Sequence, residues 1–236
     1  MINSVKPNLI VSDSRGAWFR ATILFILALI GTVGMWSVVV FIPDIEKEFG
    51  LDRGTSSLLY AFTMIGFGFG TVVIGKVYDK FGIKKPILLA TFVLITSYYF
   101  YSIFPFYWQF LILQFFMGFA ASAFFGPAMA DISNFFNKQR GFALSIVASA
   151  NYVAGATWPL LIGYFLTFID WRAAHFWISI CLFIMIPLIL LLKNASVDES
   201  KSHDMKQRYK DIRLDLSNNQ IQVLLMLAGI CCCVAM

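Results

Sequence analysis

The stretch Gly75-Lys76-Val77-Tyr78-Asp79-Lys80-Phe81-Gly82-Ile83-Lys84-Lys85-Pro86 decides how this chain folds. It is the longest polar interruption in the first half of the chain, and the apolar runs on both sides are long enough to span a membrane. We therefore predict a tight turn between two membrane-spanning helices, in which Gly75 and Gly82 permit close packing and positive φ. The lysines would hold this turn at an anionic cytoplasmic leaflet.

The composition of the chain is that of an integral membrane protein. Hydrophobic residues make up 59% of the 236 residues and charged residues only 13%, which is too apolar for an ordinary soluble domain. The net charge of +5 comes from basic residues in the gaps between apolar runs, so it indicates membrane topology and no nucleic-acid partner. The four cysteines lie inside apolar runs without the spacing of a disulfide framework or a zinc site, and we expect no metal and no cofactor.

Six apolar runs predict an all-α protein with six transmembrane helices. Each run is long enough to cross about 30 Å of hydrocarbon. The first run should end at Pro43-Asp44, and acidic residues follow it. The predicted spans are residues 17–42, 55–74, 86–104, 107–130, 141–168 and 171–192.

These spans predict four segments in the chain, namely a cytoplasmic N-terminus (1–16), a six-helix bundle (17–192), a cytoplasmic central loop (193–220) and the start of a seventh helix (221–236). Within the central loop, Met205, Tyr209, Ile212 and Leu216 recur at helical spacing and favour a helix on the membrane surface. A disordered linker of mixed charge is the alternative. The seventh run is short and the sequence stops within it, so we expect a truncated longer protein.

Basic residues predict the orientation of the bundle. With the N-terminus inside, all of the 18 lysines and arginines except Lys47, Arg53 and Arg172 fall in cytoplasmic segments. Under the positive-inside rule this distribution places the N-terminus in the cytoplasm. We expect a multi-pass protein of the plasma membrane, which in a bacterium is the inner membrane.

The opening stretch resembles the loop signature of the major facilitator superfamily, which reads Gly, three residues, Asp, Arg or Lys, one residue, Gly, one residue and then basic residues. Ile83 stands where the family often has a basic residue. The resemblance implies the N-terminal half of a transporter, a six-helix bundle of two inverted three-helix repeats. When the sequence is shifted by 88 residues against itself, Gly75 aligns with Gly163, as such a repeat predicts. The places of the signature are filled by Gly75, Asp79, Lys80, Gly82, Lys84 and Lys85.

A second segment points to a branch of this family. Residues 135–143, Phe-Phe-Asn-Lys-Gln-Arg-Gly-Phe-Ala, are similar to the start of the fifth helix in monocarboxylate and oxalate/formate-type porters. Gln139 and Phe142 depart from that pattern, and the acidic-glycine-aromatic opening of the first helix is missing. No acidic side chain is predicted near mid-membrane, which disfavours a cationic substrate. Small organic anions are therefore the expected substrate class.

The resemblance implies a central substrate cavity lined by the first, fourth and fifth helices. A buried amide in lipid needs a partner, so Gln114 and Asn151 either bond a neighbouring helix or face water and substrate. The candidate substrate contacts are the polar or aromatic residues predicted at mid-depth, Trp36, Gln114, Ser149, Asn151 and Tyr152.

The resemblance also implies a latch that closes the cytoplasmic side by contacting the second six-helix half, the expected partner of this chain. We expect Asp79 to pair with Lys80 or Arg140, and Asp131 to join this network. The candidate gate and latch residues are Gly75, Asp79, Lys80, Gly82, Lys84, Lys85, Asp131 and Arg140.

Two other functions are compatible with six membrane helices. A membrane-embedded enzyme would need clustered His, Asp or Glu at membrane depth, and the predicted spans offer no such cluster. A non-transporting binding or assembly subunit, or a half-transporter, would keep the same helices. We predict gradient-driven transport of a small molecule by alternating access, and six further spans beyond Met236 would favour it over the binding subunit.

Overall fold

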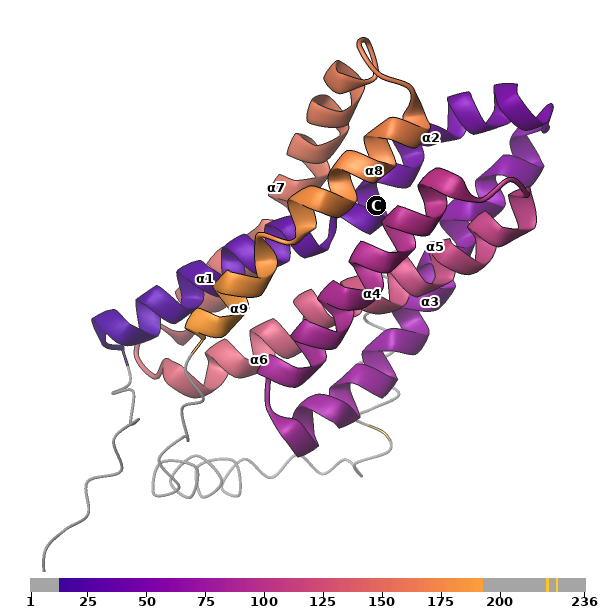
Figure 1. Ribbon diagram of the computed structural model, residues 1–236. Coiled ribbons are helices and arrows are strands. Elements are labelled where there is room, and N and C mark those ends of the chain that lie inside the picture. The colour runs from indigo at the N-terminus through magenta and orange to yellow at the C-terminus, as the bar shows by residue number, and fades with distance from the viewer. Residues whose placement is uncertain (1–12, 193–219, 221–223, 225–236) are drawn as a thin grey trace, which may run out of the picture. The chain divides into compact units, whose positions relative to one another are not determined.

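The computed structural model describes residues 13–192, 220 and 224, and within these residues the chain is a bundle of α-helices (Figure 1). Six helical spans are long and apolar enough to cross a membrane, which confirms the predicted number. The helices are α1 (Arg15–Gly31), α2 (Val33–Phe49), α3 (Arg53–Phe81), α4 (Lys84–Ile103), α5 (Tyr107–Ala121), the 3-10 helix η1 (Ser122–Phe124), α6 (Gly126–Phe135), α7 (Arg140–Phe165), α8 (Trp171–Leu182) and α9 (Met185–Leu191).

Three of the six spans consist of two helices in succession, α1 with α2, α5 with α6, and α8 with α9. The stretch where α3 turns into α4 contains four lysines, and the end of the bundle where it lies is called the basic end below. The opposite end is called the far end. The predicted surface helix of the central loop and most of the predicted seventh helix lie outside the described residues, so the domain boundaries there remain predictions.

The first span continues beyond its predicted end. Pro43 lies inside α2, and the helix runs on to Phe49, so the prediction that Pro43-Asp44 ends the span was wrong. A proline removes one backbone donor, and a helix can absorb that loss with a kink. The helix ends instead at Gly50, which adopts the left-handed conformation (φ 61°) that glycine tolerates at a helix C-terminus.

The turn at the basic end is shorter than predicted. α3 continues through Lys76 and Lys80 to Phe81, and α4 begins at Lys84, so most of the stretch that decides the fold is helical. Gly82 takes a positive φ of 73°, and its N–H bonds the carbonyl of Tyr78 at 2.8 Å. Gly75 lies in the helix, and no described atom lies within 4 Å of a Cβ placed on it, so its role in close packing remains a prediction.

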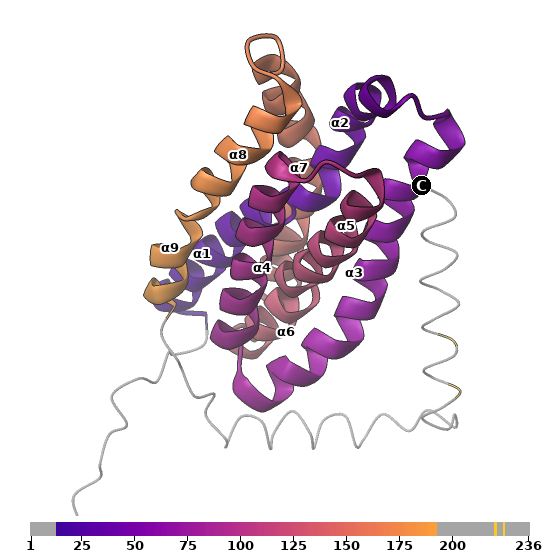
Figure 2. The same cartoon turned by 45° about the vertical axis from the view of Figure 1, so that its right-hand side comes forward.

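Glycines bring α3 and α5 into backbone contact, and the two helices run side by side (Figure 2). A Cβ placed on Gly66 would lie 2.0 Å from the carbonyl oxygen of Phe115, and one on Gly118 would lie 1.9 Å from that of Thr63. Gly70 leaves similar room for Ser122. Small residues allow such close approach between membrane helices, where lipid gives no hydrophobic drive for association. These glycines bring the backbones of α3 and α5 closer together than any Cβ would allow.

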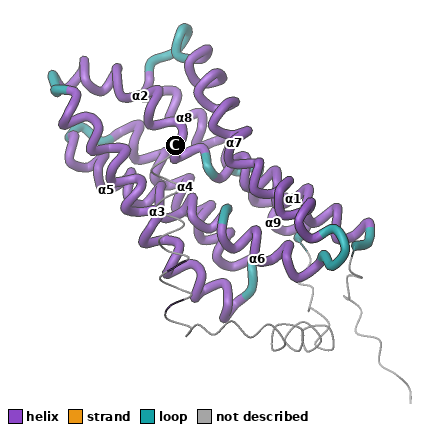
Figure 3. Tube along the Cα trace, turned by 180° about the vertical axis from the view of Figure 1, so that it is seen from behind, coloured by secondary structure: helices purple, strands orange, loops and turns teal. Residues whose placement is uncertain are grey.

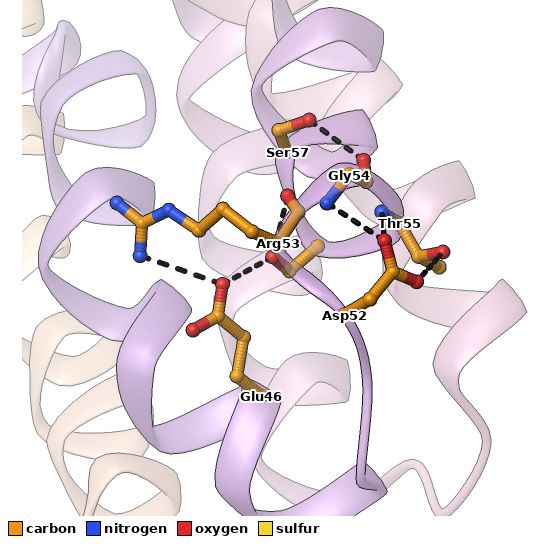
Figure 4. A network of polar contacts seen from close by, with 7 residues as sticks. Glu46, Asp52, Arg53, Gly54, Thr55 and Ser57 are labelled. Carbon is orange, nitrogen blue, oxygen red and sulfur yellow. Dashed lines mark hydrogen bonds and ion pairs between the residues drawn. The ribbon is translucent and has the colours of Figure 1, made fainter.

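The start of α3 at the far end is capped by its own sequence (Figure 4). Asp52 accepts hydrogen bonds from the backbone N–H of Gly54 at 2.9 Å and of Thr55 at 3.2 Å, and from the Thr55 hydroxyl at 2.6 Å. These bonds, with the hydroxyl of Thr55 first, lower the pKa of the Asp52 carboxyl below its ordinary value. Glu46 of α2 bonds the hydroxyl of Ser56 and lies 3.5 Å from Arg53, so it joins the α2–α3 connection to the cap.

Candidate functional site

Two of the five predicted substrate contacts meet in the structure. Trp36 of α2 donates its indole N–H to the side-chain oxygen of Asn151 on α7, at 3.2 Å. Gly155 makes room for the ring, because a Cβ there would lie 3.0 Å from Cε2 and Cζ2 of Trp36. An indole can only donate, so Oδ1 of Asn151 must face Trp36 and its Nδ2 must face away. No described residue accepts a hydrogen bond from Nδ2, which leaves a donor with a fixed direction.

The other three predicted contacts are placed elsewhere. Gln114 is buried, with its Oε1 accepting from the hydroxyl of Thr63 at 2.9 Å and its Nε2 donating to the hydroxyl of Tyr101 at 3.4 Å. Its amide therefore ties α5 to α3 and α4. Ser149 bonds the carbonyl of Ile146 in its own helix at 2.7 Å, and Tyr152 is 57% exposed. The substrate roles of these three residues remain predictions.

Most of the predicted latch residues lie on the surface of the basic end. Asp79, Lys80 and Lys85 are exposed, and Lys84 and Arg140 are half-buried. The ammonium groups of Lys80 and Lys85 lie 5.3 Å and 4.5 Å from the centre of the Phe81 ring. Asp79 forms no ion pair with any described residue, so the expected pairs with Lys80 and Arg140 are not formed here.

Asp131 pairs with Arg20 rather than joining the expected network with Asp79. Arg20 donates from Nε to Oδ2 of Asp131 at 2.6 Å and from Nη2 to Oδ1 at 2.9 Å. Both side chains are buried, with 5% and 8% of their surface exposed. The guanidinium carbon also lies 4.6 Å from the centre of the Phe135 ring. This bidentate pair joins the first span to the fourth inside the bundle.

The start of the first span is tied to the connection between α6 and α7. The carboxylate of Asp13 accepts from the backbone N–H groups of residues 137–139 at 3.1 to 3.4 Å, and its own N–H bonds the carbonyl of Phe135 at 3.1 Å. Trp18 packs edge-on against Phe136 at 4.8 Å and Phe142 at 5.9 Å. We call this set the basal clasp; it consists of Asp13, Trp18 and Arg20 on one side and Asp131, residues 135–139 and Phe142 on the other.

The environment of Asp13 favours its ionised form. Desolvation by the protein acts in the opposite direction, but the hydrogen bonds from the backbone N–H groups of Lys138, Gln139 and Asn137 together lower the pKa of the Asp13 carboxyl. Successive backbone N–H groups that converge on one carboxylate form a small anion-binding hollow. The carboxylate of Asp13 fills that hollow.

Ion pairing and aromatic packing also hold the far end together. Glu48 accepts from Nη2 of Arg172 at 2.6 Å and from the indole of Trp171 at 2.8 Å, so α2 is bound to the start of α8. His175 is buried and stacks on the ring of Tyr101 at 4.4 Å, and its Nδ1 lies 2.7 Å from the carbonyl oxygen of Trp171. In the part of the chain that the structure describes, no group of three His, Cys, Asp or Glu residues is placed to hold a metal ion.

Comparison with known proteins gives a consistent result. The family model described as Major Facilitator Superfamily matches residues 24–236. The chain is similar to an MFS-type transporter of Aspergillus niger, with 28% identity over 62% of this chain and 34% of the relative. It is also similar to the agnestins efflux protein of Paecilomyces divaricatus, with 26% identity over 64% of this chain and 35% of the relative.

A bacterial relative, the inner membrane transport protein YnfM of Escherichia coli, is 23% identical over 72% of this chain and 41% of its own length. The chain thus spans about a third of the length of the fungal relatives and 41% of the bacterial one.

Proposed function

The chain belongs to the major facilitator superfamily, a family of multi-pass membrane proteins, and on this basis we propose that the protein is a secondary transporter of small organic anions that works by alternating access. The chain's family and the transporter names of its relatives favour transport over enzymatic chemistry. The proposal goes beyond the family in naming a substrate class and a contact residue, Asn151.

The orientation of the Asn151 amide is the observation that carries this proposal. The indole of Trp36 takes up the oxygen of the amide, so the group that remains to meet a substrate is the N–H donor. A carboxylate accepts hydrogen bonds and cannot donate them once it is ionised. A fixed donor at mid-depth therefore suits a carboxylate substrate better than an ammonium.

The buried charges of the bundle support the same substrate class. Among the described residues, Asp131 is the only buried carboxylate, and Arg20 already neutralises it. A desolvated cation would need an unpaired acidic group at membrane depth. A neutral or anionic substrate needs none.

The proposed orientation places the basic end in the cytoplasm and the protein in the plasma membrane. The basic residues at this end obey the positive-inside rule, and the Escherichia coli relative is named an inner membrane protein. The relative from Paecilomyces divaricatus is named an efflux protein, so export is the direction to test first. The proposed partner of this bundle is a second six-helix half, against which it would rock about a midplane site.

The test is uptake of labelled carboxylates into liposomes that contain the full-length protein. We expect saturable transport of one or more of formate, oxalate and lactate, and none of tetraethylammonium. Asn151→Asp replaces the donor with an acceptor and should slow carboxylate transport about tenfold or more, as loss of a hydrogen bond to a charged group predicts. Thr157→Ser is the matched control on the same helix, because the Thr157 hydroxyl bonds its own helix at the carbonyl of Val153.

Two results would contradict the proposal. Transport of the cation but not of the carboxylates would reject the substrate class. No transport of any solute by correctly inserted full-length protein, together with its co-purification with another membrane protein, would favour the alternative of a binding or assembly subunit.

A further inference from the structure

The first and fourth spans are interrupted where they touch, and the two interruptions form one joint. Gly31 ends α1 and Thr32 separates it from α2, while η1 and Phe125 separate α5 from α6. A Cβ on Gly31 would lie 2.4 Å from the ring carbons Cγ and Cδ2 of Phe124. Only glycine leaves room for this ring. Because both spans already leave α-helical geometry at this contact, both can bend there without breaking a continuous helix.

On the far side of the joint, both spans are fixed to the rest of the bundle. α5 lies in backbone contact with α3 at Gly66 and Gly118, where no flexible side chain intervenes. α2 is held to α4 by a hydrogen bond of 2.6 Å between the buried hydroxyls of Ser37 and Tyr98. We call α2, α3, α4 and α5 the frame.

On the basic side of the joint, the two spans are fixed to each other instead. α1 and α6 share the bidentate pair of Arg20 and Asp131, and the other contacts of the basal clasp, made by Asp13 and Trp18, add to it at the end of α6. Separating a buried ion pair leaves two uncompensated charges in an apolar environment, which is strongly unfavourable. α1 and α6 are therefore bound to move together.

The attachment of α6 to the frame is weaker than its attachment to α1. Asn134 of α6 donates to the hydroxyl of Tyr78 on α3 at 3.4 Å, a long hydrogen bond in exposed surroundings. The glycine contacts between α3 and the fourth span end at Gly70 and Ser122, which is the joint itself. α6 can thus leave α3 at a much lower cost than it can leave α1.

α7 connects the joint to the proposed substrate contact. It is continuous from Arg140 to Phe165, and its residue Phe142 belongs to the basal clasp. Further along the same helix, Asn151 bonds Trp36, which belongs to the frame. A displacement of the clasp would be carried along this unbroken helix to the contact between Asn151 and Trp36.

We propose that α1 and α6 form a single moving body, locked by Arg20 and Asp131, which pivots against the frame at the contact of Gly31 with Phe124 and shifts Asn151 relative to Trp36 through α7. Figure 3 shows from behind that α1 and α6 both lie toward the same end of the bundle. The bundle is then not rigid during alternating access: its basic half bends while its far half keeps its packing. The purpose of the motion rests on the proposed transport function, but the motion itself does not.

The experiment measures three distances by pulsed electron paramagnetic resonance, with spin labels on the full-length protein in lipid nanodiscs. The four cysteines of this chain are first replaced by serine. The distance between Phe19 and Ala130 lies within the moving body, and the distance between Val72 and Ile112 lies within the frame. The distance between Ala130 and Lys76 joins the moving body to the frame. All five labelled side chains are exposed, so the labels leave the core intact.

We expect a wide or two-peaked distance distribution for Ala130 and Lys76, and single narrow distributions for the other two pairs. A distribution for Ala130 and Lys76 as narrow as that of the frame pair, both at pH 5 and at pH 8 and with or without carboxylates, would overturn the proposal. So would equal widths for all three pairs. Because no transport is read, a failure of the organic-anion proposal would leave this result interpretable.

Two variants separate the lock from the joint. Asp131→Asn should widen the distribution of Phe19 and Ala130 while the frame pair stays narrow, whereas a purely structural role of Asp131 would widen all three. Gly31→Ala places a methyl group against Phe124 and should narrow the distribution of Ala130 and Lys76. The double change Gly31→Ala with Phe124→Leu restores space and should restore the width; unchanged widths in both variants would reject the joint.

Discussion

Two glycines set how closely α3 and α5 approach each other. At Gly66 and Gly118 the neighbouring backbone lies closer than any Cβ would allow, so these positions fix the separation of α3 and α5. Gly126, the first residue of α6, has open space around it. On the fourth span, Gly118 is therefore needed for helix packing, whereas Gly126 is not.

Gly118→Ala is expected to destabilise the protein by about 1–3 kcal/mol, because the added methyl group would lie 1.9 Å from the Thr63 carbonyl oxygen and force α3 away from α5. Thermal unfolding in detergent would show this as a lower transition temperature. Gly126→Ala is the matched control and should leave the transition unchanged. Equal effects of the two changes would argue against backbone contact between the helices.

Asp13 should hold the α6–α7 connection in place only while it is ionised. Its pKa is lowered in the folded protein, so its contribution is complete above the ordinary value of 3.8 and is lost as the pH falls through the folded value. Asp13→Ala should therefore speed hydrogen exchange of the amides of residues 137–139 at pH 7. If the variant and the parent protein exchange alike at pH 7, this contact does not hold the connection.

From the sequence, Trp36 and Asn151 were predicted to line the same cavity, but the hydrogen bond between them was not predicted. The pair of Arg20 and Asp131 was missed altogether. These two residues are 111 positions apart, and no local pattern relates them. Their shared signal was that each is a charge within or at the edge of an apolar run, which is costly in a membrane unless the charge is paired. Matching such charges across spans would have found the pair.

At the scale of the helices, hydrophobicity predicted the six spans, but it could not predict where they break. Pro43 was expected to end a helix and does not. The chain breaks at Thr32 without a proline, and it breaks at Ser122–Phe124 just before Pro127, which has no N–H to bond the carbonyl of Ala123. At Thr32 the hydroxyl bonds the carbonyl of Ala28 at 2.8 Å, so a side chain satisfies the backbone at the break. Such breaks depend on prolines and on local hydrogen bonds of polar side chains, which the pattern of apolar residues does not contain.

Asp79→Asn is expected to impair transport while leaving membrane insertion intact. Asp79 is exposed near the end of α3 and has no ion-pair partner among the described residues, so its carboxylate is available to a second bundle. The measurement is uptake at equal membrane abundance, with Asp79→Glu as the charge-retaining control. Unchanged uptake by the asparagine variant would remove Asp79 from the latch.

At the scale of the whole molecule, the two ends of the bundle differ in charge and in how they are held. The basic end carries the lysines of the α3–α4 turn, and the far end is held by Glu48 against Arg172. The difference in charge was predictable from the sequence, because it follows from counting basic residues in the connections between spans. The contact between Glu48 and Arg172 was not predicted.

The orientation can be checked with single cysteines and a membrane-impermeant maleimide on intact cells. Phe106→Cys at the far end should be labelled from outside, and Lys76→Cys at the basic end should be labelled only after the cells are opened. Both positions are exposed, so accessibility to the reagent differs only by the side of the membrane. Labelling of Lys76→Cys on intact cells would reverse the proposed topology.

The ion pair of Arg20 and Asp131 also has a consequence for the synthesis and membrane insertion of the protein. Arg20 leaves the ribosome 111 residues before its partner, which at ordinary rates of synthesis is a delay on the order of ten seconds. During that interval the first span must enter the membrane with an arginine near its end, where the long side chain can still reach the aqueous interface. That arginine can be buried only after the fourth span has been made. The first span therefore reaches its final position in the bundle only at that stage.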